Sequence, residues 1–161
     1  MFSKPRQIDS ESALYDAAMK ILMRRAHSVH EMKQALERRC EDASLIKNVL
    51  ARLKQNGYID DARYAKQFTR HRTESRKQGR FRIARDLRAR GVPDRHIEAA
   101  LVRQRIERKL RASRGEIDDR KLASLYRSLL RAGFSPDAIR TELRSITQAA
   151  PDEFEPSAPP D

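Results

Sequence analysis

The side chains with the clearest capacity for chemistry are nine cations in the middle of the sequence. They are Arg70, Arg72, Arg76, Lys77, Arg80, Arg82, Arg85, Arg88 and Arg90. Arginine predominates, and its planar guanidinium group donates paired hydrogen bonds to phosphate and carboxylate groups. We therefore interpret these nine residues as candidates for binding an acidic protein surface or a nucleic acid.

The positive charge of the chain is concentrated around these residues. Residues 62–115 contain eighteen Lys and Arg against five Asp and Glu, a net charge of +13, and the whole chain carries +12. If about five of these cations met phosphates, the affinity would fall with salt with a logarithmic slope on the order of −4 to −5. The alternative is a solvated, salt-bridged helix face. The excess of one sign argues against it.

Other polar groups could suggest catalysis or metal binding, but each has a structural explanation. They are His27 and His30 with Glu31 and Cys40, and the pairs Asp60–Asp61 and Asp118–Asp119. The two histidines straddle a predicted helix start, and both aspartate pairs precede helical runs, where carboxylates cap helices. The sequence has no glycine-rich phosphate loop, G-x-S-x-G elbow or Cys-x-x-Cys pair. We expect no enzyme activity, no cofactor and no metal.

The elements that must position the cations are predicted to be helices. Leu, Ala, Arg, Lys and Glu dominate, and Gly and β-branched residues are scarce, which favours an all-α fold. Ser28 and Glu31 form a capping-box pattern, and Asn56-Gly57 is typical of a helix end. Ser135-Pro136 is typical of a helix start. Phe81 is the best candidate for stacking on a base, but its helical spacing from Ile83, Ala84 and Leu87 predicts a core position instead.

Three segments share one register. Leu36, Leu87 and Leu129 are each followed by a small or helix-breaking residue at +4, by an isoleucine at +10 and by a leucine at +14. This pattern predicts tandem repeats in which two helices meet across a tight turn. A single turn of this kind around Gly91 resembles a DNA-reading helix-turn-helix, but its triplication indicates an architectural role.

We therefore predict an all-α, elongated array of three tandem three-helix repeats, the third of them shortened. The predicted ranges are a disordered tail at 1–8, repeat one at 9–59, a basic repeat two at 60–112, a short repeat three at 113–148 and an acidic, Pro-rich disordered tail at 149–161. Residues 102–117 are predicted to form one long polar helix running on from repeat two. The single cysteine and the lack of a secretory signal or membrane-spanning stretch predict a cytoplasmic protein. We also expect it to be a monomer.

Three segments resemble the RecX family, the regulators of the RecA recombinase. They are LARLKQNGYIDDARYAKQF at 50–68, RIARDLRARGV at 82–92 and KLASLYRSLLRAGFSPDAIRTEL at 121–143. The most specific part is G-Y-I-D-D-x-R-Y-A, and the three segments occur in the family's order between residues 50 and 143. The link between repeats two and three is compressed relative to the family, which affects the spacing of the last module.

The resemblance implies tandem three-helix repeats in an elongated protein that binds RecA and the RecA–DNA filament. It implies inhibition of filament growth, ATP hydrolysis and strand exchange in recombination and DNA repair, within the SOS response. A curved basic rod could lie in the filament groove, bridging protomers or blocking addition of the next. Direct nonspecific binding of single- or double-stranded DNA is a further expectation. The alternatives are a nonspecific architectural DNA-binding protein that acts without RecA, and a helical adaptor that docks through its acidic tail.

Overall fold

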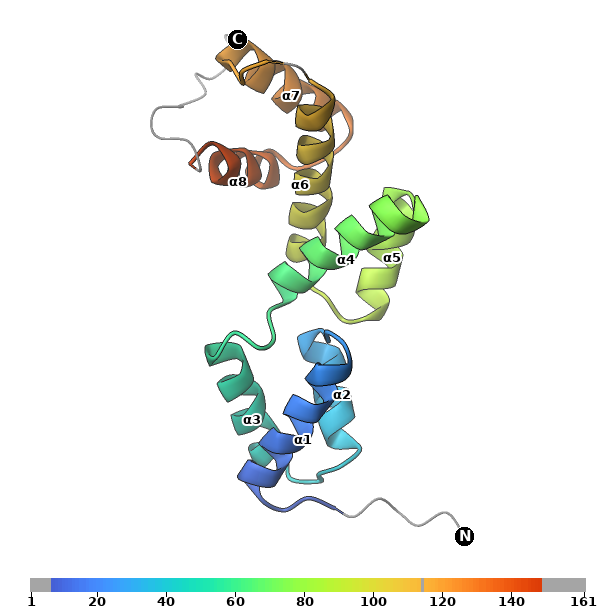
Figure 1. Ribbon diagram of the computed structural model, residues 1–161, viewed down its shortest axis with the longest axis vertical. Helices are drawn as coiled ribbons and strands as arrows, with labels where there is room; N and C mark the ends of the chain where they lie inside the picture. Colours follow the sequence, from blue (N-terminus) through green and yellow to red (C-terminus); the bar gives the residue numbers. More distant parts are fainter. Residues whose placement is uncertain (1–6, 114, 149–161) are drawn as a thin grey trace.

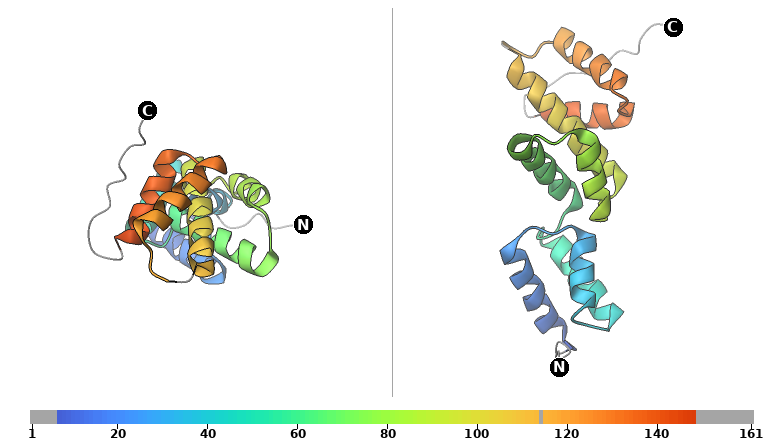
Figure 2. Two further views of the ribbon diagram at one scale, coloured as in Figure 1. Left: turned by 90° about the horizontal axis from the view of Figure 1, so that it is seen from above. Right: turned by 90° about the vertical axis from the view of Figure 1, so that its right-hand side faces the viewer.

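A computed structural model describes residues 7–113 and 115–148. In this part of the chain all regular structure is helical, and no strand is present. The helices are α1 (Glu11–Arg24), α2 (Val29–Glu37), α3 (Ala43–Gln55), α4 (Asp61–Arg76), α5 (Arg80–Ala89), α6 (Asp94–Ala112), α7 (Asp119–Arg131) and α8 (Pro136–Thr147). They stack along one long axis as a rod of three small units (Figure 1, and from the side in Figure 2). The predicted fold, an elongated all-α repeat array with a shortened third unit, is confirmed.

The first unit packs α1, α2 and α3 around one apolar core. Its fully buried side chains include Leu14, Met32, Leu36 and Leu53. The predicted capping box is present, because Ser28 accepts from the Glu31 backbone N–H and the Glu31 carboxylate accepts from the Ser28 backbone N–H. These caps satisfy amides that a helix start would otherwise leave unpaired, so each short helix begins at a defined residue.

The second unit packs α4 and α5 against the N-terminal half of α6. Asp60 caps α4, because its carboxylate accepts a hydrogen bond from the Arg63 backbone N–H. Of the pair Asp60–Asp61, Asp60 is therefore the capping residue. The core of this unit includes Ala65, Ile83, Leu87 and Ile97. A rigid scaffold therefore lies beneath the basic residues of α4 and α5.

The third unit is short because it has no first helix of its own. The C-terminal half of α6 takes that place, with Val102 and Ile106 fully buried against α7 and α8. The prediction of a polar helix over residues 102–117 was correct in continuing the preceding helix. It was wrong in its polarity and its end, because α6 stops at Ala112 and contributes Val102 and Ile106 to the third core. Units two and three therefore share one continuous helix.

The repeated positions occupy equivalent places in the three cores. Leu36, Leu87 and Leu129 are fully buried in cores one, two and three, and the isoleucines at +10 are also buried. Gly91 ends the turn after α5 with φ of +71°, a conformation that glycine adopts without steric cost. The shared register thus reflects one packing solution used three times.

Most of the two predicted tails lies outside the described residues, namely 1–6 and 149–161. Of the N-terminal range, Gln7 and Ile8 are described. The Ile8 backbone N–H donates to the Arg39 carbonyl at 2.8 Å, and the Ile8 side chain packs on the first core. Among the described helices, none is at once long and apolar enough to cross a membrane.

Candidate functional site

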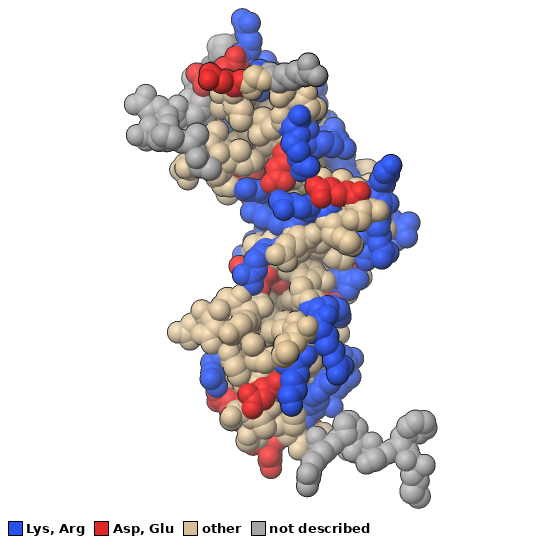
Figure 3. All heavy atoms as spheres, viewed as in Figure 1, with Lys and Arg blue, Asp and Glu red and all other residues tan. Residues whose placement is uncertain are grey.

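The nine predicted cations lie on the C-terminal half of α4, on the α4–α5 connection, on α5 and, for Arg90, at the C-cap of α5. Figure 3 shows Lys and Arg side chains gathered over this middle unit and along its right-hand edge. Six of the nine side chains are exposed, and we call these six the basic face: Arg70, Arg76, Lys77, Arg82, Arg85 and Arg88. The other three, Arg72, Arg80 and Arg90, are half-buried.

The basic face is only weakly neutralised by the protein itself. Within the described part of the chain, Arg76, Lys77 and Arg82 have no ion-pair partner. Arg70 reaches Glu107 at 3.6 Å, Arg85 reaches Asp86 at 3.6 Å and Arg88 reaches Asp94 at 2.6 Å. Pairs this exposed contribute about 0–1 kcal/mol, so an external phosphate or carboxylate can replace them at little cost. On α5 the three arginines follow at three-residue steps and present one continuous surface.

Arg90 joins the first unit to the second. Its guanidinium contacts the Glu31 carboxylate at 2.8 Å and lies over the Phe68 ring, and its carbonyl accepts from the Ser28 hydroxyl at 2.6 Å. Nearby, the Val29 N–H donates to Asp61 at 2.9 Å. The cap of α2 is therefore also the contact between two units, which sequence reasoning did not predict.

Glu31 is charged at this junction. Burial acts to raise its pKa, but hydrogen bonds from Arg25, the Ser28 N–H and Arg90, together with the charge of Arg25, outweigh burial, so the pKa of Glu31 lies below 4.5. The buried Tyr64 hydroxyl lies beside it, and burial followed by the Glu31 charge raises the pKa of Tyr64. Near neutral pH, Glu31 is thus an anion that receives donors from both units.

Replacing Glu31 with Gln is expected to weaken this junction in a pH-dependent way. Because the folded-state pKa is depressed, the contribution of Glu31 to stability is complete above 4.5 and is lost as the pH falls through the folded-state value. We expect Glu31→Gln to lower the free energy of unfolding by roughly 1–3 kcal/mol at neutral pH, and by much less in acid. Urea titrations at about pH 7 and about pH 3 measure both values. The control is Glu37→Gln, which removes an exposed pair with Lys33. An equal loss at both pH values would contradict the prediction.

Arg80 and a buried carboxylate join the second unit to the third. Arg80 donates to the Ala132 carbonyl at 2.7 Å, in the turn between α7 and α8. Glu142 of α8 is buried and receives Lys66 of α4 at 3.4 Å and Arg103 of α6 at 3.4 Å. Burying a carboxylate is costly unless it is paired, so these contacts hold α8 against α4 and α6. Hydrogen bonds and ion pairs therefore connect neighbouring units at both junctions of the rod.

Two further features were not predicted from the sequence as parts of a site. Phe81, expected in the core, is 78% exposed, because it lies on the outer side of α5. A cleft of about 670 Å³ opens between the end of α4, the α4–α5 connection and the C-terminal half of α6. It is lined by Thr73, Glu74, Lys77, Gln78, Gly79, Gln104, Arg108, Arg111 and Ala112. In the sequence, only the overall charge of residues 62–115 pointed to Arg108 and Arg111, the two cations that α6 contributes to this cleft.

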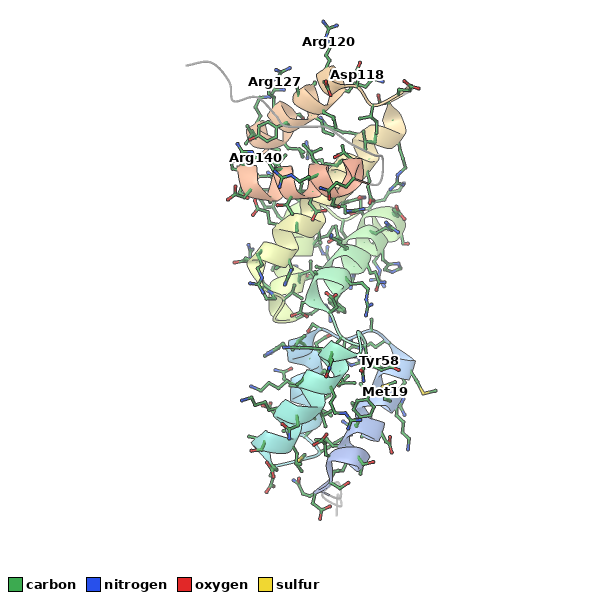
Figure 4. All side chains as sticks on the ribbon, turned by 90° about the vertical axis from the view of Figure 1, so that its left-hand side faces the viewer. Met19, Tyr58, Asp118, Arg120, Arg127 and Arg140 are labelled. Carbon is green, nitrogen blue, oxygen red and sulfur yellow. The ribbon has the colours of Figure 1, made fainter. Side chains whose placement is uncertain are left out.

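The third unit carries further cations away from the basic face. Figure 4 shows Arg120 and Arg127 on α7 and Arg140 on α8, all on the third unit. All three are exposed, and Arg140 contacts Asp137 at 3.8 Å. They offer a charge-matched comparison for the residues of α5.

Comparison with known proteins identifies the family. The family model for the RecX first three-helix domain matches residues 15–53, and that for the second three-helix domain matches residues 60–101. A regulatory protein RecX from Halorhodospira halophila is 36% identical over 159 residues, covering 93% of this chain and 95% of the relative. The chain belongs to the RecX family. The second domain model ends at Leu101, where α6 passes from the second core to the third.

Other members of the RecX family are more distant. A regulatory protein RecX from Chlorobaculum tepidum is 28% identical over 144 residues, covering 84% of this chain and 89% of the relative. The crystal structure of RecX from Lactobacillus salivarius is similar with a TM-score of 0.51 and 20% identity, covering 86% of this chain and 97% of that one. That similarity concerns the fold, and membership of the RecX family assigns the chain a regulatory role.

Proposed function

We propose that this protein inhibits the RecA recombinase by binding the RecA–DNA filament and limiting its growth, ATP hydrolysis and strand exchange. The observation that carries the proposal is the basic face, whose exposed cations lie on the rigid middle unit of an elongated rod. RecA is the partner that RecX family membership suggests. The protein acts in the cytoplasm as a monomer and by binding, without catalysis.

The shape and charge of the molecule suggest how it acts. A rod whose units are held together at both junctions can contact several repeating subunits at once. The arginines of α5 can bind carboxylates of one partner and phosphates of another. Such a contact bridges adjacent RecA protomers or blocks addition of the next. Guanidinium groups bind carboxylates and phosphates only in a defined geometry. Binding therefore depends on the junctions, which fix the relative positions of the units, as well as on the charges.

The proposal is tested by RecA-catalysed ATP hydrolysis on single-stranded DNA, with this protein titrated from substoichiometric to equimolar ratios. Saturating DNA removes inhibition that arises only from competition for free strands. We expect inhibition well below one copy per RecA, because one rod at a filament end or groove affects many protomers. Unchanged hydrolysis at an equimolar ratio would overturn the proposal.

A second candidate function is that of a nonspecific DNA-binding or architectural protein that acts without RecA. The unpaired cations of the basic face favour it, since phosphate contacts alone give salt-dependent, sequence-independent binding. In the same titration, inhibition that disappears when free DNA is saturating supports this candidate. Inhibition that persists on preformed filaments supports the contact with RecA.

A further inference from the structure

Phe81 is an exposed aromatic ring held in place by a fixed cation. The Arg80 guanidinium lies 4.8 Å from the centroid of the Phe81 ring and 5.2 Å from that of Phe134. Arg80 is itself anchored by its hydrogen bond to the Ala132 carbonyl. A cation over one face of the ring is attracted by its π-electrons and limits its rotation. The opposite face of Phe81 remains available for a planar partner.

The surroundings of Phe81 suit a nucleotide. Phe81, Arg85 and Arg88 recur at helical spacing and form one exposed stripe on α5, and Arg82 lies next to the ring in the sequence. An exposed ring among cations combines a stacking platform for a base with donors for its phosphate. No acidic residue lies in the first turn of α5 to oppose an anion there.

The cleft beside α5 supplies a place for the neighbouring phosphate. Gly79 lines the cleft and caps α5 without a side-chain hydrogen bond, so the first amides of a ten-residue helix are open. Lys77, Arg108 and Arg111 line the same cleft against one carboxylate, that of Glu74, which pairs with Arg111 at 3.3 Å. The cleft therefore holds an excess of two positive charges.

Two amides in the cleft wall also lack partners. The side-chain carbonyl oxygens of Gln78 and Gln104 are shielded from solvent and have no hydrogen-bond partner among the described residues. A shielded, unpaired polar atom is unfavourable. Turning either amide exchanges this oxygen for the NH₂ group, which can donate to an anion. These two side chains are an observation independent of the cations and of the helix end.

We propose that this corner of the second unit is a subsite for single-stranded nucleic acid, with a base stacked on Phe81 and an adjoining phosphate in the cleft. Duplex DNA does not fit this role, because its bases are already stacked and present no free face. The subsite deepens the proposed function, since it rests on DNA being part of the filament that the protein binds. It assigns the single strand, and not the duplex, to this corner.

The test uses the full-length protein alone, without RecA, and fluorescence anisotropy with three labelled probes. The probes are an oligo-dT of about 15 nucleotides, the same backbone with abasic sites, and a duplex of equal length. We expect Phe81→Ala to weaken oligo-dT binding roughly 5- to 100-fold, and to leave the abasic and duplex probes unaffected. Phe81→Trp should restore oligo-dT binding. Because Phe81 is exposed, these variants should fold normally, which circular dichroism verifies.

Two matched variants separate the base from the phosphate. Tyr58→Ala removes a 48% exposed ring on the first unit (Figure 4), and all three probes should bind as before. Arg108→Ala should weaken binding of both single-stranded probes alike, with or without bases, and reduce the salt slope by about one. Loss of preference for bases in Phe81→Ala, together with a salt slope reduced by about one in Arg108→Ala, would support the subsite.

Several results would overturn the subsite, and they are distinct from failure of the proposed function. Equal binding of oligo-dT and the abasic strand by the unmodified protein would overturn it, as would an equal loss on all probes in Phe81→Ala. Normal strand binding by Phe81→Ala with weaker inhibition of RecA would show that the ring meets protein instead, and the proposed function would stand. Base-dependent binding without any effect on RecA would leave the subsite and remove the proposed function.

Discussion

Reversing the charge of Arg82, Arg85 and Arg88 together, each to Glu, is expected to abolish binding to RecA–DNA filaments while the helicity of the protein is retained. The three side chains are exposed, and the ion pairs they make are also exposed, so their loss changes stability little. If all three meet phosphates or carboxylates, affinity should fall roughly 100-fold or more at moderate salt, and the salt slope should decrease by about three. Cosedimentation with filaments and inhibition of RecA ATP hydrolysis measure the effect.

The matched control is the triple reversal of Arg120, Arg127 and Arg140 on the third unit. Each Arg→Glu change lowers the charge by two, so either triple variant takes the chain from +12 to +6. General attraction is therefore equal in the two variants, and only the position of the change differs (Figure 4). If the α5 variant inhibits RecA as the unmodified protein does, the basic face is not the contact surface. An equal loss in both variants would indicate diffuse charge instead.

The parts of the fold that were predictable from the sequence depend on local chemistry. The capping box at Ser28 and the helix start at Ser135-Pro136 each use residues within a few positions of one another. The repeat register was also readable, because the same buried leucine and isoleucine return in each core. Regular packing of short helices therefore leaves a pattern that spacing alone reveals.

The parts that were not predictable depend on contacts between distant residues. Arg80 and Arg90 belong to the same charged run as the rest, but the structure directs them to Ala132 and Glu31. Nothing in their own sequence neighbourhood separates them from Arg82 or Arg85. Phe81 was misplaced for a related reason, since each residue step turns a side chain by about 100° around the helix, which is enough to move a ring from the core to the surface. Local spacing identified the basic run without separating its exposed residues from those that contact another unit.

The junction between the first two units is expected to be the most sensitive point of the rod, and replacing Gly91 with Ala tests it. Gly91 has φ of +71°, and a Cβ there would lie 2.7 Å from the His30 Cδ2 atom and closer still to its Cβ and Cγ. The position of the His30 Cβ is set by the α2 backbone, so rotation of the ring cannot relieve this overlap. The start of α2 must move away from the turn before α6, together with the Ser28 and Arg90 contacts. We expect the free energy of unfolding to fall by about 2–5 kcal/mol.

Gly57→Ala separates the effect of backbone conformation from that of overlap. Gly57 has φ of +72°, but a Cβ there meets no atom within 4 Å, so its cost should be only about 1–2 kcal/mol. Urea unfolding compares the two variants, and small-angle scattering shows whether Gly91→Ala changes the angle between units. In the Gly91 variant, His30→Gly should recover part of the loss because it removes the overlapping atoms. Equal losses in the two alanine variants would mean that the junction accommodates the added atom. If Gly91→Ala also inhibits RecA less under conditions where it remains folded, binding to RecA requires the native orientation of the first two units.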